Sequence, residues 1–233
     1  MKQDTIRVGA VIAAGGMAQR MQGVDKQLLE LNGVPVLVRS IQALAQVRSI
    51  QELVVVARQE QFAQLQSWKE QYHLPDFVLT TGGATRQQSV QAGIAKLSEQ
   101  VEYFVIHDGA RPFVTPEVLE QVILRAAECG AAAPAVPVHD TIKRAAGGLV
   151  EETLNREELF AVQTPQVFEP SLIKAALQKA AEEGATLTDD CAAVERLGMT
   201  VCLTRGSDEN IKITTPADLN LGLGILNGRG ELV

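Results

Sequence analysis

Two cationic side chains follow a run of small residues near the N-terminus. The segment AVIAAGGMAQRM, residues 10–21, passes from an apolar stretch into small residues, and a lysine follows it. Small side chains let backbone N–H groups approach phosphate oxygens, and two cations can neutralise a polyphosphate. The pattern predicts a phosphate-binding loop, although an ordinary strand-to-helix turn with two solvated cations is an alternative. The candidate contacts are Ala14, Gly15, Gly16, Arg20 and Lys26.

A carboxylate stands at the end of a second apolar run, FVIHDGARPF, residues 104–113. Asp108 is expected at the carboxyl end of a strand, where a hard oxygen ligand is well placed to hold Mg²⁺. Gly109 and Arg111 follow it. Because Asp-Gly is also a common turn element, Asp108 could instead cap a turn and pair with Arg111. His107, the residue before it, is expected to be structural and not catalytic.

Two further segments carry polar groups that could contact a ligand. In GGATRQQSV, residues 82–90, glycines precede a helix start. The backbone of Gly83 and Ala84 and the hydroxyl of Ser89 could therefore read the edge of a base. In ENIKIT, Lys212 is expected within an apolar strand, between two isoleucines. Taken alone, the first segment favours a simple helix start, and the second favours a lysine that faces solvent.

Short apolar runs alternate with amphipathic segments along most of the chain. The runs are rich in Val and Ile and nearly continuous, as expected for parallel strands covered on both faces. They occupy residues 6–13, 52–57, 76–80, 102–107 and 132–138. The amphipathic segments predict helices at about residues 35–46, 59–72, 85–98 and 116–129. Repeated βα units imply an α/β fold with an open, doubly wound, mostly parallel sheet, and ligands of such sheets bind at the carboxyl ends of the strands.

The later helices have clear start signals. A Thr-Pro pair, which is favourable at a helix start, occurs at 115–116 and again at 215–216, the second time with Asp218 at the capping-box position. The remaining expected elements are a helix from the TDD sequence at 188–190 to Gly198, and strands at 199–204 and 210–214.

Residues 139–165 interrupt the alternation. A Gly147-Gly148 turn separates two semi-polar extended stretches, which predicts a β-hairpin arm that leaves the body of the protein. A hairpin alone is marginal in water, so the arm needs a surface to lie on, and a partner subunit could supply it. No linker or repeat is evident. We expect one domain over residues 1–233, with 139–160 as a dimerisation arm.

The composition argues against several classes of protein. With 233 residues, 46% of them apolar, the chain can bury the core of one α/β domain. Its formal charge of −7 argues against broad binding to nucleic acid or to anionic membranes. No apolar run approaches the ~20 residues of a membrane span, and the N-terminal run is typical of a strand and not of a signal peptide. The three separated cysteines suggest neither a disulfide framework nor a zinc site, which favours a reducing, cytoplasmic location.

Taken together, the motifs resemble one family over nearly the whole chain. In order, they are AAGGMAQRM with Lys26, GGATRQQSV, HDGARP, PVHDTIKR, NREELFAVQTPQ, TDD and ENIKIT. The order is that of the 2-C-methyl-D-erythritol 4-phosphate cytidylyltransferases, which serve the methylerythritol phosphate route to isoprenoids. Each motif is weak alone, but seven in register are specific. HDGARP, TIKR and the TPQ segment separate this family from the wider nucleotidyltransferases.

The resemblance implies a nucleotidyltransferase that uses Mg²⁺ or another divalent cation. Its substrates would be CTP and 2-C-methyl-D-erythritol 4-phosphate, and its products a cytidine-diphospho sugar alcohol and pyrophosphate. The expected catalytic cations are Arg20, Lys26 and Lys212, the first two acting with the 14–18 loop on the triphosphate. The expected contacts of base and ribose are Gly83, Ala84, Ser89 and Gly109, and Asp108 is the carboxylate near the metal. The expected contacts of the acceptor or its phosphate are Arg111, Thr141, Arg156, Thr164 and Lys212. In this family Thr141 and Arg156 reach across from the neighbouring subunit's arm, which implies a homodimer with exchanged arms.

Some features leave other functions open. Ala18 and Asp25 stand where the family usually has glycine and proline, so a non-catalytic CTP-binding interaction protein is one alternative. Ribitol-5-phosphate cytidylyltransferases share the fold and chemistry, but more often have HDAVRPF where this chain has HDGARPF. A NAD-binding oxidoreductase is disfavoured because GxGxxG is absent, as is the P-loop sequence GxxxxGK[ST].

Overall fold

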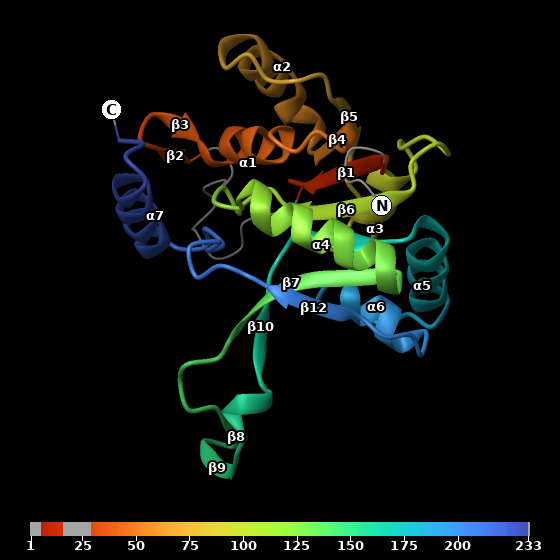
Figure 1. The fold of residues 1–233 in the computed structure, drawn as a ribbon, viewed down its shortest axis with the longest axis vertical. Coiled ribbons are helices and arrows are strands. Elements are labelled where there is room, and N and C mark those ends of the chain that lie inside the picture. The colour runs from red at the N-terminus through yellow and green to blue at the C-terminus, as the bar shows by residue number, and fades with distance from the viewer. Residues whose placement is uncertain (1–5, 16–28, 233) are drawn as a thin grey trace.

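The computed structural model describes residues 6–15 and 29–232, which form a central sheet with helices on both faces (Figure 1). One half of the sheet is parallel and has the order β6-β1-β4-β5. These strands are β1 (Val8–Ala13), β4 (Ile50–Ala57), β5 (Val78–Thr81) and β6 (Tyr103–Asp108). They lie within a few residues of four of the five runs that the sequence predicts.

The other half of the sheet is mixed. β7 (Ala131–Pro137) pairs antiparallel with β11 (Gln166–Phe168) and β10 (Phe160–Val162), and parallel with β12 (Cys202–Arg205). Because Ala132 pairs with both β11 and β12, these two strands lie on opposite edges of β7. β11 also pairs antiparallel with β6 and so joins the two halves. The expected mostly parallel, doubly wound sheet is confirmed, with β10 and β11 as reversed strands that the sequence analysis did not predict.

Alternate residues of the strands enter two separate cores. Ile12 and Val55 pack in one core, whereas their neighbours Val11 and Val54 pack in the other. Side chains alternate across a strand, so a sheet that is covered on both faces needs apolar residues at every position. This is why the strand sequences are continuous apolar runs.

The helices divide between the two faces according to these cores. Residues of α1, α2 and α4 pack in the first core, and residues of α3, α5 and α6 pack in the second. α7 packs in a third, smaller cluster with Leu31 and Phe113. The helices are α1 (Val36–Ala45), α2 (Phe62–Gln71, after a 3₁₀ turn at Gln59–Gln61), α3 (Arg86–Ile94), α4 (Pro116–Cys129), α5 (Pro170–Glu182), α6 (Cys191–Arg196) and α7 (Pro216–Gly228).

The predicted helix starts are confirmed. The Thr115 hydroxyl accepts a hydrogen bond from the Val118 N–H, and Thr215 and Asp218 form a capping box at the start of α7. The prediction of a strand at 210–214 is wrong, because that segment has no regular structure. The Ile213 N–H donates to the Ala110 carbonyl in a loop, and this pairing ties the segment to the end of β6 and not to a sheet edge.

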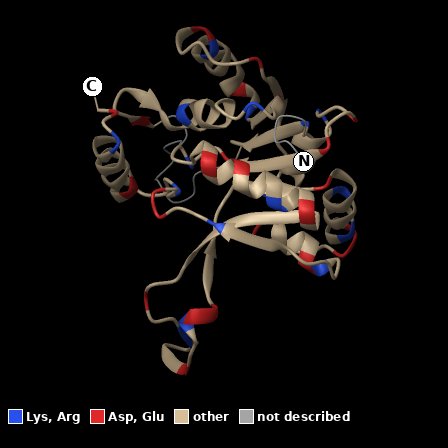
Figure 2. Cartoon of the chain, in the orientation of Figure 1, with Lys and Arg blue, Asp and Glu red and all other residues tan. Residues whose placement is uncertain are grey.

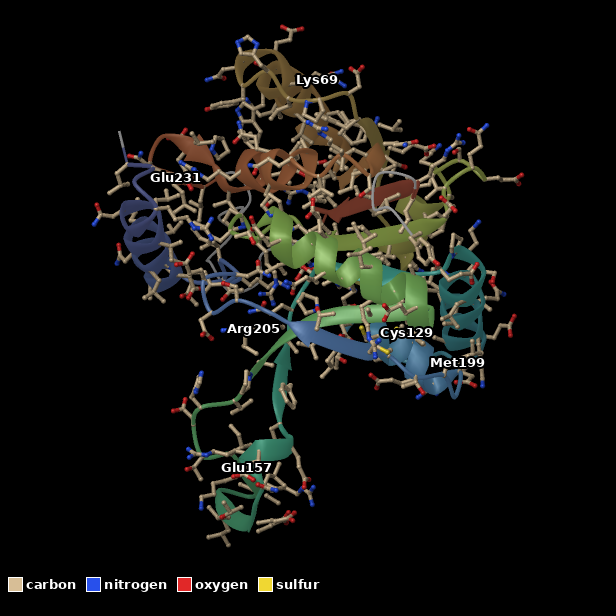
Figure 3. All side chains as sticks on the ribbon, in the orientation of Figure 1. Lys69, Cys129, Glu157, Met199, Arg205 and Glu231 are labelled. Carbon is tan, nitrogen blue, oxygen red and sulfur yellow. The ribbon has the colours of Figure 1, made fainter. Side chains whose placement is uncertain are left out.

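The arm forms the predicted hairpin. β8 (Lys143–Ala146) and β9 (Leu149–Thr153) pair antiparallel across Gly147 and Gly148, both of which have positive φ. The hairpin projects from the body beyond β7 and β10 (Figure 1), and Glu157, in the 3₁₀ turn Arg156–Glu158 that follows it in the arm, lies well away from the central sheet (Figure 3). A second, short hairpin is formed by β2 (Glu30–Leu31) and β3 (Val34–Pro35).

Charged residues of both signs are spread over the elements in the view of Figure 2. None of the helices in the described part of the chain is both long and apolar enough to cross a membrane.

Candidate active site

Asp108, the last residue of β6, is surrounded by three cations. Its Oδ2 lies 2.6 Å from Lys212 Nζ and 3.9 Å from Arg111 Nε, and its Oδ1 lies 3.5 Å from Arg86 Nη2. Burial acts to raise the pKa of Asp108, but the charges of Lys212 and Arg86 outweigh it and hold the pKa at about 2. Asp108 is therefore an ionised carboxylate at neutral pH. The site carries more positive than negative charge around this carboxylate, which suits an anionic ligand.

His107 lies behind Asp108 and is fully buried. Its Nε2 is 3.0 Å from the Arg111 carbonyl oxygen, and its Nδ1 is 3.1 Å from the hydroxyl of Thr164. A carbonyl can only accept, so Nε2 carries the proton and the Thr164 hydroxyl donates to Nδ1. Burial lowers the pKa of His107 to about 4. A neutral, doubly bonded imidazole is a structural group, as the sequence suggests.

Thr164 is an anchor for the end of β6. It is buried, and its hydroxyl accepts a hydrogen bond from the Asp108 N–H at 3.1 Å. The hydroxyl is thus committed to Asp108 and His107 in this structure. Asn210, also buried, donates to the Thr164 carbonyl at 2.9 Å, and its backbone carbonyl accepts from Arg111 Nη1 at 2.6 Å. These bonds bring the 163–166 and 210–213 segments to one carboxylate.

The ends of β1 and β6 lie close together beside Asp108. The Gly109 N–H donates to the Ala13 carbonyl at 3.0 Å, and a Cβ on Gly109 would lie 3.0 Å from Leu37 Cδ1. The Ala14 N–H donates to the Val56 carbonyl at 2.8 Å, so this amide is not free for a phosphate. Gly15, the next residue, ends the described part of the loop.

The 82–85 loop is built by hydrogen bonds from the first turn of α3. The Ser89 hydroxyl accepts from the Gly83 N–H at 3.2 Å and donates to the Thr85 carbonyl at 2.9 Å. A Cβ on Gly83 would lie 2.3 Å from Gln88 Cβ, so only glycine fits there. Ser89 is buried and shapes the loop, whereas Gly83 and Ala84 are exposed.

Several groups at the site were not among the predicted site residues. Arg86 contacts Asp108 and also buried Asp190, at 2.7 Å. Gln163 and Gln166 bind the 207–210 and 189–191 segments, respectively. The motifs GGATRQQSV, NREELFAVQTPQ and TDD contain these residues, but no spacing in the chain indicates which partners they have.

Comparison with known proteins identifies the family. The model of the family described as 2-C-methyl-D-erythritol 4-phosphate cytidylyltransferase matches residues 8–227. The chain belongs to this family. A cytidylyltransferase of that name from Desulforamulus reducens is 46% identical over 224 residues, 94% of this chain and 96% of the relative. Another, from Halalkalibacterium halodurans, is 43% identical over 93% of this chain and 95% of the relative.

Solved structures of cytidylyltransferases have the same fold. The 4-diphosphocytidyl-2C-methyl-D-erythritol synthase from Anaerococcus prevotii has a TM-score of 0.85 at 28% identity, covering 95% of this chain and 99% of that one. The 2-C-methyl-D-erythritol 4-phosphate cytidylyltransferase from Thermus thermophilus has a TM-score of 0.78 at 30% identity, covering 95% of this chain and all of that one.

The remaining predicted site residues either lie outside the described part of the chain or belong to the arm. Gly16, Arg20 and Lys26 lie outside the described residues, as do Ala18 and Asp25. Thr141 and Arg156 lie in the arm and are exposed, and Arg156 Nη1 donates to the His139 carbonyl at 3.0 Å. In a single chain, the arm that carries these two residues projects away from the body (Figure 1).

The donor set at Asp108 fits a magnesium ion that binds together with a nucleotide. Within the described residues, no group of three His, Cys, Asp or Glu side chains could hold a metal alone. Mg²⁺ commonly uses one or two carboxylates and takes its other ligands from substrate phosphates and water. Asp108 is ionised, and among the described residues its Oδ1 has only the long contact with Arg86, so this oxygen can accept a cation.

Proposed function

We propose that the protein joins CTP and 2-C-methyl-D-erythritol 4-phosphate to give 4-diphosphocytidyl-2-C-methyl-D-erythritol and pyrophosphate. The observation that carries the proposal is the site around Asp108, in a chain that belongs to the cytidylyltransferase family over residues 8–227. Lys212, Arg86 and Arg111 surround one ionised carboxylate at the carboxyl end of β6, where α/β sheets bind ligands.

The proposed reaction is a direct displacement. A phosphate oxygen of the acceptor attacks the α-phosphorus of CTP, the new P–O bond forms, and the bond from the α-phosphorus to the bridging oxygen breaks to release pyrophosphate. The acceptor is already an anion, so no strong general base is needed. The main obstacle is the repulsion between two anions, which positioned cations reduce.

The residues have distinct proposed roles. Asp108 would hold Mg²⁺, which when bound neutralises phosphate charge and orients the leaving group. Arg20 and Lys26 would grip the triphosphate, while Lys212 and Arg111 would contact phosphate beside Asp108. In these roles Arg20 and Lys26 rest on the family's motif alone. For Lys212 and Arg111, the distances to Asp108 give independent support.

The base is expected to be cytosine. Gly83 and Ala84 leave backbone groups exposed in a loop held from behind by Ser89. Backbone acceptors can bind the exocyclic amino group of cytosine, whereas uracil has a carbonyl there and would leave an acceptor unpaired, at a cost of ~1–3 kcal/mol.

We further propose that the working enzyme is a cytoplasmic homodimer that exchanges its arms. Arm 139–160 has no core of its own, since all residues of β8 and β9 are exposed. Thr141 and Arg156 would complete the acceptor pocket of the other subunit. The three free cysteines are compatible with a reducing compartment.

Pyrophosphate release tests the proposed function. CTP with 2-C-methyl-D-erythritol 4-phosphate and Mg²⁺ should release pyrophosphate, and UTP or ATP should support much less. Ribitol 5-phosphate is the matched acceptor control, because the alternative cytidylyltransferase would prefer it. Tight CTP binding without any pyrophosphate release would instead support a non-catalytic CTP-binding protein.

A further inference from the structure

The proposed reaction assigns no role to Asp190, a buried aspartate. It lies just before α6 and is 1% exposed, but its side chain does not cap that helix. Its Oδ2 lies 2.7 Å from Arg86 Nη2, although the angles are too poor for an aligned hydrogen bond. A buried carboxylate is costly and is kept only when a cation accompanies it. The cation that accompanies Asp190 is Arg86.

The neighbouring Asp189 supplies the structural contacts of this segment. Its Oδ1 accepts from the Ala192 N–H at 3.0 Å, and its Oδ2 accepts from Gln166 Nε2 at 2.7 Å. Gln166 Oε1 in turn accepts from the N–H groups of Asp190 and Cys191. These bonds fix the start of α6 without the Asp190 carboxylate, which leaves that carboxylate free to act on Arg86.

Arg86 is shared unequally between two carboxylates. The same nitrogen, Nη2, lies 2.7 Å from Asp190 and 3.5 Å from Asp108 Oδ1. An arginine that met Asp108 alone would form the shorter, two-pronged pair that guanidinium and carboxylate groups prefer. Because Lys212 already holds Oδ2 at 2.6 Å, such a pair would occupy the other oxygen of Asp108.

We propose that Asp190 is a positioning residue that holds Arg86 back from Asp108, so that Asp108 keeps an oxygen for the Mg²⁺–CTP complex. This inference rests on the proposed function, since it assumes that Asp108 meets Mg²⁺ and nucleotide. Asp190 is the second aspartate of the TDD motif. It would affect nucleotide binding through Arg86, without contacting the nucleotide itself.

Calorimetric titration of CTP without acceptor tests the inference, because no turnover occurs. In Mg²⁺, Asp190→Asn should bind CTP about ten- to a hundredfold more weakly than wild type, the usual effect of losing a group that orients a metal ligand. In EDTA, the two proteins should differ little. The matched control is Asp189→Asn, which loses the same charge one residue away. It should lower the melting temperature but leave CTP affinity in Mg²⁺ near wild type.

A double variant separates positioning from a merely structural role. In Arg86→Gln/Asp190→Asn, no guanidinium remains to close on Asp108, so Mg²⁺-dependent CTP binding should be tighter than in Asp190→Asn. Equal or weaker binding would overturn the inference, as would unchanged affinity in folded Asp190→Asn. If Asp190→Asn does not fold, the double variant still tests the inference, because neither buried charge of the pair remains in it. An affinity for CTP in Mg²⁺ about a hundredfold below that of wild type would then overturn the inference.

CTP binding by wild type, in Mg²⁺ and in EDTA, tests the proposed function separately from the inference. If wild-type protein binds CTP no better in Mg²⁺ than in EDTA, the proposed use of Asp108 fails, and the inference about Asp190 fails with it. If wild type responds to Mg²⁺ and Asp190→Asn responds equally, only the inference fails.

Discussion

At the scale of single residues, the site depends on one carboxylate and the cations that it gathers. The Lys212 side chain is 43% exposed, whereas that of Asp108 is 11% exposed, so only the lysine end of the pair is open to solvent. Without Lys212, Asp108 would still have Arg86 and Arg111 beside it, so its charge would not be left unpaired. The value of Lys212 should therefore lie in its contact with developing phosphate charge, and not in stability.

Lys212→Ala tests whether Lys212 contributes to catalysis more than to stability. Removal of one positioned cation should lower the rate of pyrophosphate release by on the order of a hundredfold, about 2–4 kcal/mol of transition-state stabilisation. The melting temperature should change little. Lys69→Ala, which removes a half-buried lysine of α2 that pairs with Asp76, is the control and should keep full activity. Near-wild-type turnover by folded Lys212→Ala would exclude it from catalysis.

His107 predicts a pH dependence of stability. Burial lowers its pKa to about 4, below the ordinary value of about 6.5 for an unfolded chain. As the pH falls, the unfolded chain therefore binds the proton first. The unfolding free energy should fall between about pH 6.5 and 4, by up to ~1.4 kcal/mol per pH unit, and this contribution should level off at lower pH. Urea unfolding of wild type and His107→Gln in EDTA measures it. If the unfolding free energies of the two proteins changed equally with pH, the lowered pKa of His107 would be contradicted.

At the scale of elements, the start of α3 combines a helix cap with the loop that is proposed to bind the nucleotide. Thr85 and Gln88 form a capping box, and Ser89 holds Gly83 from inside the helix. The loop that is proposed to contact the base is thus held by the first turn of α3. The same turn also carries Arg86, so one short element supplies both the proposed base contacts and a cation beside Asp108.

Gly83→Ala should damage this element. The added Cβ would lie 2.3 Å from Gln88 Cβ, an atom next to the helix backbone that cannot easily move away. Loss of the cap should cost ~1 kcal/mol of unfolding free energy and raise the KM for CTP. Gly224→Ala, in α7, is the control. Apart from its chain neighbours and its own helix backbone, no atom of the described residues lies within 4 Å of the added Cβ, and alanine favours a helix interior by ~0.5–1 kcal/mol. Equal effects of the two substitutions would show that the loop tolerates a side chain.

At the scale of the whole molecule, the arm leaves several apolar side chains exposed to solvent. Leu149 and Val150 are 75% and 62% exposed in the hairpin, and Phe160 is 47% exposed at its root. Apolar side chains on a hairpin without a core gain most from packing on another surface. A twofold dimer would supply that surface to both arms at once.

Mixed dimers test whether the arms are exchanged. Arg156→Ala and Lys26→Ala subunits should each be nearly inactive alone. If Arg156 serves the partner's site, a mixed dimer has one site with both defects and one with neither, so activity should partly recover on mixing. Subunit exchange must be confirmed separately, by the mass of tagged dimers. No recovery despite exchange would indicate that each site is built from one chain.

The sequence by itself determined the elements whose signals are local. Continuous Val- and Ile-rich runs predicted β1, β4, β5, β6 and β7 to within a few residues, because a sheet covered on both faces needs apolar residues at every position. Cap residues located α4 and α7. Helix α5 was not predicted, although Glu169 caps it and Pro170 begins it, so a local signal was present. Motif order, and not geometry, identified the family.

Only the tertiary structure decided which charges meet. Lys212 follows the pattern of a strand residue, but the pairing of Ile213 with Ala110 pulls its segment into a loop beside Asp108. The three-residue strand β11 has no periodicity to reveal it, and its position follows from pairing with β6 and β7. Arg86 and Asp190 are distant in sequence, and ion pairs leave no local pattern because their partners are chosen by the fold. The sequence supplied the cations and carboxylates of the site, and long-range packing determined their partners.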